Sequence, residues 1–188
     1  METKQHICPV WVGYLMTSPL RKLQQNPKKI LAPYINQGIK ILEVGSAMGY
    51  FSIPMAKMTG QNGKVYCVDV QENMLKKLDK RAKRKGVKEI IESRLANHNS
   101  LNIKELTGEI DFTLLAYVVH EIPDQKKLFT EVAKAMKKNA IALYIEPKMH
   151  VKEKVWLESL RIARENGFIL CKSVSVPGSR AFELVKNV

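Results

Sequence analysis

Residues 41–56 read ILEVGSAMGYFSIPMA and combine a β-rich run, a glycine-containing loop and the start of a helix. Glycine suits such a loop because the backbone turns sharply and a ligand can approach it closely. The next β-rich run, VYCVDV at residues 65–70, carries Asp69 near its end. A carboxylate in that place can accept hydrogen bonds from both hydroxyls of a ribose. The pattern predicts a nucleoside-containing ligand; the alternative is a tight turn followed by an ordinary capping acid.

The spacing of the glycines narrows the kind of nucleoside ligand. A dinucleotide-binding loop has the pattern GxGxxG and holds a pyrophosphate at the N-terminus of the following helix. Here three other residues separate Gly45 from Gly49, which does not match that spacing. The loop therefore fits a smaller nucleoside ligand without phosphates. Asp69 also disfavours NADP, because its charge would repel the 2′-phosphate.

Alternating strands and helices are expected along the whole chain. Short β-rich runs occur at residues 39–44, 65–70, 89–95, 110–119, 140–146, 168–174 and 181–185. The middle runs are almost continuously apolar, as in parallel strands covered on both faces. The segment between the last two runs is too short for a parallel crossover. We expect one α/β domain over residues 1–188, with a doubly wound Rossmann-like seven-stranded sheet, mostly parallel with an antiparallel last strand.

Two of the expected helices have informative ends. Asn26 and the proline after it resemble an N-cap and a first helical residue, and they predict a helix that ends before Gly38. Another helix is expected to begin after Pro123. Its last turn would hold Lys137 and Lys138, where the helix dipole favours cations.

Composition excludes several classes of protein. The chain has 188 residues, of which 45% are hydrophobic and 26% charged, as in a globular domain. No apolar run approaches the roughly 20 residues needed to span a bilayer. The three cysteines lie far apart and form no CxxC pair, so we expect neither a disulfide framework nor a metal site. A cytoplasmic protein without a membrane span is the expectation.

Positive charge is the most unusual feature of the composition. Lys and Arg number 31 against 18 Asp and Glu, which gives a net charge of +13. Residues 76–88 hold eight basic residues and one acid, more than half of that excess. Such a helix face could bind phosphates, but it lacks interleaved aromatic residues and should lie on a flank of the sheet. We favour a solvated face and keep RNA as the second choice of partner.

These motifs resemble those of the class I S-adenosylmethionine-dependent methyltransferases, especially the small single-domain members similar to quinone-biosynthesis and arsenite methyltransferases. The first family motif, an acid followed by a glycine-rich loop, matches residues 42–49, and the second, an acid that ends strand two, matches Asp69. The expected strands match the family's sheet over about residues 28–188. The resemblance implies S-adenosyl-L-methionine as the cofactor and S-adenosyl-L-homocysteine as its product.

The resemblance also implies roles for particular residues. The backbone at Gly45 and Gly49 would contact the methionine part of the cofactor, and Glu43 would orient the loop and reach the ammonium through water. Asp69 would bind the ribose hydroxyls, and Val70 would lie against the adenine. The expected cofactor-binding residues are Glu43, Gly45, Ser46, Ala47, Gly49, Asp69, Val70, His98, Asn99 and Ala116.

The chain departs from the family pattern at two of these positions. Ala47 stands where the family usually has a second glycine. Asn99, with His98 beside it, stands after strand three, where an aspartate is commoner. The carbonyl of Asn99 can still accept from the adenine amino group. Because Asn99 is neutral, we expect that contact to be weaker than one made by a carboxylate.

His120 is the candidate catalytic residue. Methyl transfer from a sulfonium is an in-line displacement in which positioning and water exclusion do much of the work. The fourth strand leads into AYVVHEIPD, residues 116–124, and its carboxyl end should face the methyl group. A histidine suits proton abstraction near neutral pH. The alternative is that His120 and Glu121 only shape the loop while Asp124 caps the next helix, since a base is needed only if the acceptor loses a proton.

The N-terminal extension, residues 1–27, precedes the core of residues 28–188 and is expected to cover the site. In the family such extensions supply part of the acceptor pocket; the alternative is a helix packed on the sheet edge. The expected pocket residues are Trp11, Tyr14, Tyr117, His120 and Met149.

A small-molecule acceptor is the partner that we favour. The alternatives are an RNA or protein methyltransferase that uses the basic face, or a catalytically silent protein that binds S-adenosylmethionine. The identity of the acceptor and the oligomeric state have no signal in the sequence.

Overall fold

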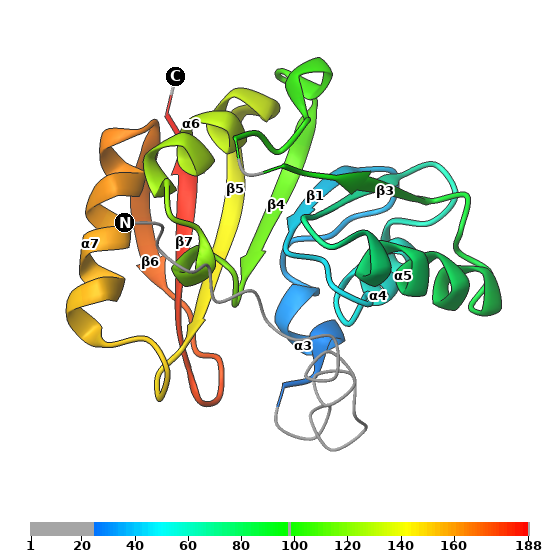
Figure 1. Ribbon diagram of the computed structural model, residues 1–188, viewed down its shortest axis with the longest axis horizontal. Coiled ribbons are helices and arrows are strands. Elements are labelled where there is room, and N and C mark those ends of the chain that lie inside the picture. The colour runs from blue at the N-terminus through cyan, green and yellow to red at the C-terminus, as the bar shows by residue number, and fades with distance from the viewer. Residues whose placement is uncertain (1–24, 98, 188) are drawn as a thin grey trace.

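Residues 25–97 and 99–187 are described by the computed structural model, and they form a seven-stranded sheet flanked by helices (Figure 1). The strands are β1 (Lys40–Val44), β2 (Lys64–Asp69), β3 (Ile91–Leu95), β4 (Ile110–Ala116), β5 (Met136–Pro147), β6 (Phe168–Ser173) and β7 (Ser179–Lys186). The helices are α3 (Pro27–Leu31), α4 (Ser52–Thr59), α5 (Glu72–Arg84), α6 (Gln125–Ala135) and α7 (Glu153–Glu165). Two short 3₁₀ helices are η1 (Lys104–Leu106) and η2 (Val119–Glu121).

The order of the strands confirms the predicted fold class. It is β3-β2-β1-β4-β5-β7-β6, and pairing is parallel from β3 through β5. β7 runs antiparallel to both of its neighbours, as expected for the last strand. The strand order reverses between β1 and β4, and in open α/β sheets ligands bind beyond the carboxyl ends of the strands at such a point.

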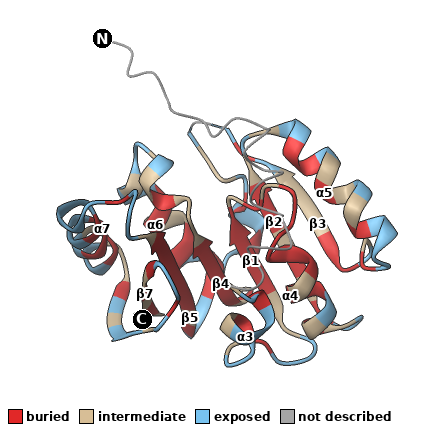
Figure 2. Cartoon of the chain, turned by 90° about the horizontal axis from the view of Figure 1, so that it is seen from below, coloured by how far each residue is buried: buried red, intermediate tan, exposed pale blue. Residues whose placement is uncertain are grey.

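Two apolar layers cover the sheet. One packs α6 and α7 against one face, with Phe129, Tyr144 and Trp156 in its centre. The other packs α3, α4 and α5 against the opposite face, with Phe51 and Leu78 among its members. Figure 2 shows buried residues along the central strands and exposed residues on the outer sides of the helices. Burial on both faces explains why the middle β-rich runs are almost continuously apolar.

The first expected helix is shorter than predicted. Asn26 is the N-cap, and its side chain accepts a hydrogen bond from the backbone of Lys28 at 3.0 Å. α3 ends at Leu31, however, and Gly38 lies beyond an intervening turn rather than just past a helix. Pro33 accounts for the early end, because it has no N–H with which to continue the helical hydrogen bonds.

Two other predicted boundaries, the ends of β4 and of α6, were also wrong. β4 stops at Ala116 instead of residue 119, because Tyr117 has a φ of +61° and turns the chain into η2. α6 stops at Ala135, so Lys137 and Lys138 lie in β5 rather than in a helical last turn. Met136 is fully buried and pairs with Ile110, and this pairing in the sheet outweighs the helical spacing.

Candidate functional site

The loop after β1 has left-handed backbone at three of its residues. The φ angles are +75° at Gly45, +45° at Ala47 and +81° at Gly49. A Cβ at Gly45 would lie 2.6 Å from Cγ2 of Val118, and one at Gly49 would collide with the side chain of Leu78. Both glycines are therefore required by backbone conformation and by neighbouring protein atoms. The close approach of a ligand, which motivated their prediction, is an additional role that the structure leaves as a prediction.

Asp69, at the carboxyl end of β2, is bound to this loop. Its Oδ2 accepts a hydrogen bond from the backbone N–H of Ala47 at 2.8 Å, and its Oδ1 accepts one from Gln71 at 2.8 Å. Each carboxylate oxygen can accept more than one hydrogen bond, so capacity is left for two hydroxyls. Burial raises the pKa of Asp69, and the backbone hydrogen bonds oppose that rise.

Glu43 lies beneath the loop rather than at its surface. It is 3% exposed, and the hydroxyl of Ser52 at the start of α4 donates a hydrogen bond to it. Burial raises the pKa of Glu43 to about 8, so its carboxyl group is largely protonated at neutral pH. Glu43 thereby connects β1 to α4, on the two sides of the loop, which agrees with an orienting role. Its predicted contact with a cofactor ammonium stays a prediction.

The side chain of Ser46 is a buried polar group in the loop after β1. It is 2% exposed, and its hydroxyl has no hydrogen-bond partner within residues 25–97 and 99–187. A buried unsatisfied hydroxyl is costly unless a ligand or water completes it. Ser46 was among the predicted cofactor residues, and its position in the loop fits a ligand with polar groups.

Exposed apolar side chains lie next to Asp69. Val70 is 46% exposed and Leu95 is 48% exposed, at the carboxyl ends of the neighbouring strands β2 and β3. Asp69 and Leu95 are register partners in the parallel pair. Such apolar surface can cover the face of a flat aromatic ring. Leu95 was not predicted, although its position at the end of the third β-rich run was a usable signal.

Of the three remaining predicted cofactor residues, the structure describes Asn99 and Ala116. Asn99 is exposed, and its backbone N–H donates to Oδ1 of Asn97 at 2.8 Å. Ala116 is the last residue of β4 and is partly buried. His98 lies outside the described residues, as do Trp11 and Tyr14 of the predicted acceptor pocket.

His120 lies in η2, directly beyond β4, and pairs with Glu146 of β5. The distance from His120 Nδ1 to Glu146 Oε2 is 2.6 Å, and the backbone N–H of His120 donates to Glu146 Oε1 at 3.0 Å. Glu146 is fully buried. Burial alone would lower the pKa of His120, but the hydrogen bond and negative charge of Glu146 outweigh it and raise that pKa.

Two further residues surround His120. Oε1 of Glu121 lies 4.0 Å from His120 Nε2, and the ring of His150 meets the His120 ring edge-on with centroids 5.0 Å apart. Glu146 and His150 are site residues that the sequence analysis missed. The only available signal for Glu146 was its place at the carboxyl end of the fifth β-rich run.

Two of the predicted acceptor residues, Tyr117 and His120, have different partners. The ring of Tyr117 stacks on Phe51 at 6.4 Å, and its hydroxyl lies 2.9 Å from Oγ of Ser179. Tyr117 thus packs with the layer of α4, whereas His120 is paired with Glu146. Met149 is fully exposed in the segment after β5. Pocket lining by Tyr117 and Met149 stays a prediction.

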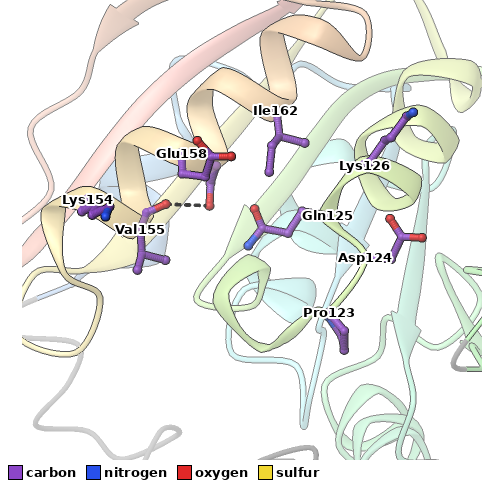
Figure 3. A pocket seen from close by; sticks show the side chains of 9 residues that line it. Pro123, Asp124, Gln125, Lys126, Lys154, Val155, Glu158 and Ile162 are labelled. Atoms are coloured by element: carbon purple, nitrogen blue, oxygen red, sulfur yellow. Dashed lines mark hydrogen bonds between the residues drawn. The ribbon is translucent and has the colours of Figure 1, made fainter. Parts of the chain in front are cut away.

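A separate open pocket lies between α6 and α7 (Figure 3). Its volume is about 480 Å³, and Gln125, Val155 and Ile162 contribute to its walls. None of the predicted cofactor or acceptor residues lines it. Within the part of the chain that the structure describes, no cluster of His, Cys, Asp and Glu could hold a metal ion. No helix of these residues is long and apolar enough to cross a membrane.

The basic face of α5 is largely exposed. Lys76 pairs with Glu72 at 2.9 Å and Lys88 with Asp79 at 2.8 Å. Arg81 points the other way, and its Nη1 donates to the backbone carbonyl of Met48 in the loop after β1 at 2.5 Å. On α5 and at the residue just beyond it, the exposed basic residues without an acidic partner in the described chain are Lys80, Lys83, Arg84 and Lys85.

Most of the chain is similar to a known protein family. A family model described as a methyltransferase domain matches residues 35–174. The demethylmenaquinone methyltransferase of Geobacillus stearothermophilus is 25% identical over 112 residues, which cover 60% of this chain and 47% of that protein. The chain thus spans about half the length of the curated relatives that it matches.

Solved structures share the fold. A SAM-dependent methyltransferase from Aquifex aeolicus superposes with a TM-score of 0.82 at 23% identity, covering 96% of this chain and 98% of that one. A geranyl diphosphate methyltransferase in complex with SAM gives a TM-score of 0.72 at 12% identity, covering 94% and 90% of the two chains. At these identities the similarity concerns the arrangement of strands and helices.

Proposed function

The chain belongs to the methyltransferase-domain family, and from this premise we propose that it transfers a methyl group from S-adenosylmethionine to a small-molecule acceptor. The observation that carries the proposal is the position of Asp69. Its carboxylate is held by two backbone N–H groups, retains capacity for two more hydrogen bonds, and lies beside exposed apolar side chains. That combination suits a ribose joined to an adenine.

The residues around Asp69 fit the rest of the cofactor. Val70 and Leu95 would cover the faces of the adenine, and the unsatisfied hydroxyl of Ser46 would bind a polar group of the methionine part. The N–H groups of Gly45 and Gly49 already donate to the carbonyls of Val68 and Ser46, so these two glycines shape the loop from which the Ser46 hydroxyl would contact the cofactor. The cofactor, when bound, supplies an activated methyl group on a sulfonium sulfur.

The chain's own contribution to the reaction is positioning and proton transfer. Residues at the carboxyl ends of β4 and β5 would hold the acceptor against the methyl group and exclude water. His120, whose side chain is 14% exposed, would serve as the base for an acceptor that loses a proton. Glu146 keeps the imidazole in place through its hydrogen bonds to Nδ1 and the backbone N–H.

A small molecule is the favoured acceptor for two reasons. The curated relatives include demethylmenaquinone methyltransferases, whose name specifies a quinone-type substrate. In addition, the unpaired cations of α5 follow the helix away from Asp69, because β2 leads into the N-terminal end of α5 and these cations belong to its last turns and the residue beyond it. RNA is the second candidate, and the same exposed cations support it.

Isothermal titration calorimetry with S-adenosylhomocysteine tests the proposal. We expect one site per chain, together with a rise in melting temperature as the ligand concentration increases. NAD⁺ is the matched control, since it also carries an adenosine but needs space for a pyrophosphate. Absence of binding by both S-adenosylmethionine and S-adenosylhomocysteine would overturn the proposal.

A further inference from the structure

His120 and Glu146 form a pair that selects one of the two neutral forms of the imidazole ring. Glu146 lies fully buried in β5, and its two oxygens face Nδ1 and the backbone N–H of His120 at 2.6 and 3.0 Å. An ionised carboxylate only accepts hydrogen bonds, so Nδ1 must carry the proton in this contact. The lone pair of neutral His120 is then on Nε2.

The second ring nitrogen of His120, Nε2, lies near Glu121 of the same 3₁₀ helix. Glu121 Oε1 is 4.0 Å from Nε2. Burial raises the pKa of Glu121, His120 opposes that rise, and the charges of Glu146 and Asp69 add to it. Because Nδ1 is bonded to Glu146, His120 can accept a proton from an acceptor only if its lone pair is on Nε2.

We propose that Glu146 is the positioning residue that holds His120 as the Nδ1–H tautomer, and that the acceptor is an acidic hydroxyl of a phenol or enol. This inference rests on the proposed function. The O–H bond of the acceptor breaks toward Nε2 of His120 as a bond forms between the acceptor oxygen and the methyl carbon. The bond from sulfur to that carbon breaks at the same time, so the sulfonium becomes a neutral thioether and His120 becomes an imidazolium.

The strength of the base selects the acceptor class. A phenol has a pKa of about 10, and an imidazolium has one near 6.5. These values are close enough for the phenol to pass its proton to the imidazole while the methyl group is transferred. An aliphatic alcohol, with an acidity near that of water at about 15.7, is too weak an acid for this base. An alkyl amine is an ammonium ion near neutral pH, with a pKa of about 10 like that of a phenol, so the strength of the base does not separate these two classes. Among hydroxyl acceptors, the His120–Glu146 pair thus suits an acidic hydroxyl rather than an aliphatic one.

The titration of His120 depends on groups from three segments. Glu146 of β5 bonds Nδ1, Glu121 of η2 lies near Nε2, and His150 from the segment after β5 contacts the ring edge. Glu146 and Glu121 favour the charged imidazolium when they are ionised, and a protonated His150 would oppose it. The carboxylate that is directly hydrogen-bonded is expected to dominate.

Nuclear magnetic resonance of protein labelled with ¹⁵N-histidine tests the tautomer without any acceptor. The chain has four histidines, and the variant His120→Asn identifies the resonances of His120. We expect neutral His120 to carry its proton on Nδ1 in the wild type, with a pKa above 6.5. A wild-type spectrum with the proton on Nε2 would overturn the assignment, and this result does not depend on whether any Glu146 variant folds.

Two variants separate the hydrogen bond from the charge. Glu146→Gln should lower the pKa of His120 and allow the Nε2–H tautomer to appear. The matched control Glu121→Gln removes an equally charged group that lies 4.0 Å away. It should shift the pKa less and leave the tautomer unchanged. Equal effects of the two variants would contradict a special role for Glu146.

A methyl-transfer assay tests the acceptor class. With methyl-labelled S-adenosylmethionine, we expect transfer to catechol or 1,4-dihydroxynaphthalene but not to benzyl alcohol. Glu146→Gln should lower kcat at least about 10-fold, move the acidic limb of the pH profile to lower pH, and leave the KM for S-adenosylmethionine unchanged. Transfer to benzyl alcohol, or to neither of the acidic hydroxyl compounds, would overturn the acceptor class. Failure of the proposed function is distinct, because S-adenosylhomocysteine would then not bind at all.

Discussion

Asp69 Oδ2 accepts a hydrogen bond from the backbone N–H of Ala47 at 2.8 Å, and this bond joins the end of β2 to the loop after β1. Ala47 has a φ of +45°, a conformation that costs a non-glycine residue about 1–2 kcal/mol. The hydrogen bond helps to hold that conformation. The carboxylate therefore has two tasks: it shapes the loop, and it is the predicted ribose acceptor.

Asp69→Asn should weaken the binding of S-adenosylhomocysteine about 10- to 100-fold, because a hydrogen bond to a charged group contributes roughly 1.5–3 kcal/mol. Calorimetry gives the dissociation constant directly. Asp111→Asn is the matched control. Asp111 lies at the amino end of β4 and pairs with Lys137, so its loss should affect stability but not affinity. Equal affinity of wild type and Asp69→Asn would contradict the ribose assignment.

The packing of Gly49 against Leu78 leads to a second prediction. Gly49→Ala should lower the free energy of unfolding by about 2–4 kcal/mol, because left-handed backbone and a collision with Leu78 both act against the new methyl group. Gly86→Ala isolates the backbone part, since its φ is +67° and no atom lies within 4 Å of the added Cβ. That control should cost about 1 kcal/mol in denaturant unfolding.

A double variant then isolates the collision. Leu78→Ala alone opens a cavity in the core, but combined with Gly49→Ala it removes the side chain that the new methyl group meets. The two changes should therefore couple favourably by about 1 kcal/mol or more. Strict additivity would show that the steric explanation is wrong.

The fold and the glycine loop could be predicted because their signals are local. β-rich runs, the Asn26 cap and the acid after the second run each depend on neighbouring residues in the sequence. Predictions failed where long-range pairing decides the outcome. Met136 leaves its helical pattern because Ile110 offers it a place in the sheet, a contact that no short window of sequence contains.

The pairing of His120 with Glu146 could not be predicted for the same reason. The two residues meet because β4 and β5 pair in parallel with Ala116 opposite Ile145, which brings the residues beyond β4 next to the end of β5. Sequence alone placed His120 at the end of a strand. It contained no information on which neighbouring strand would supply a carboxylate.

The buried carboxyl group of Glu43 leads to a prediction about pH. Its pKa in the folded protein is raised to about 8 from the usual 4.5. The folded state therefore binds the proton more tightly than the unfolded state, so the stabilisation is complete below pH 4.5 and declines as the pH rises toward 8. Over this range the stability contributed by Glu43 should fall by a few kcal/mol.

Glu43→Gln should flatten this part of the stability profile, because the amide does not ionise. Denaturant unfolding at several values between pH 5 and pH 8 measures the effect. The free energy of unfolding of the variant should rise relative to that of the wild type as the pH rises. Glu92→Gln is a control, since Glu92 is a partly exposed acid of β3, which β2 separates from β1. Parallel profiles for wild type and Glu43→Gln would contradict the raised pKa.

The exposed cations of α5 distinguish the two candidate acceptors. The triple variant Lys80→Ala, Lys83→Ala, Lys85→Ala removes three positive charges but keeps Arg81, whose guanidinium contacts the loop after β1. If the acceptor is a small molecule, both the affinity for S-adenosylhomocysteine and the methylation of a phenol should stay within about twofold of wild type. The reason is that exposed charges beyond a Debye length of about 8 Å are largely screened at physiological salt.

Binding to transfer RNA, measured across a range of salt concentrations, provides the opposing measurement. If these cations contact phosphates, the triple variant should lose up to about three units of the slope of log K against log salt concentration. A matched variant, Lys126→Ala, Lys127→Ala, Lys134→Ala on α6, changes the net charge equally at another place. We expect the two triple variants to behave alike, because a solvated helix face acts only through net charge. A selective loss of RNA binding by the α5 variant, with cofactor affinity intact, would instead favour RNA as the acceptor.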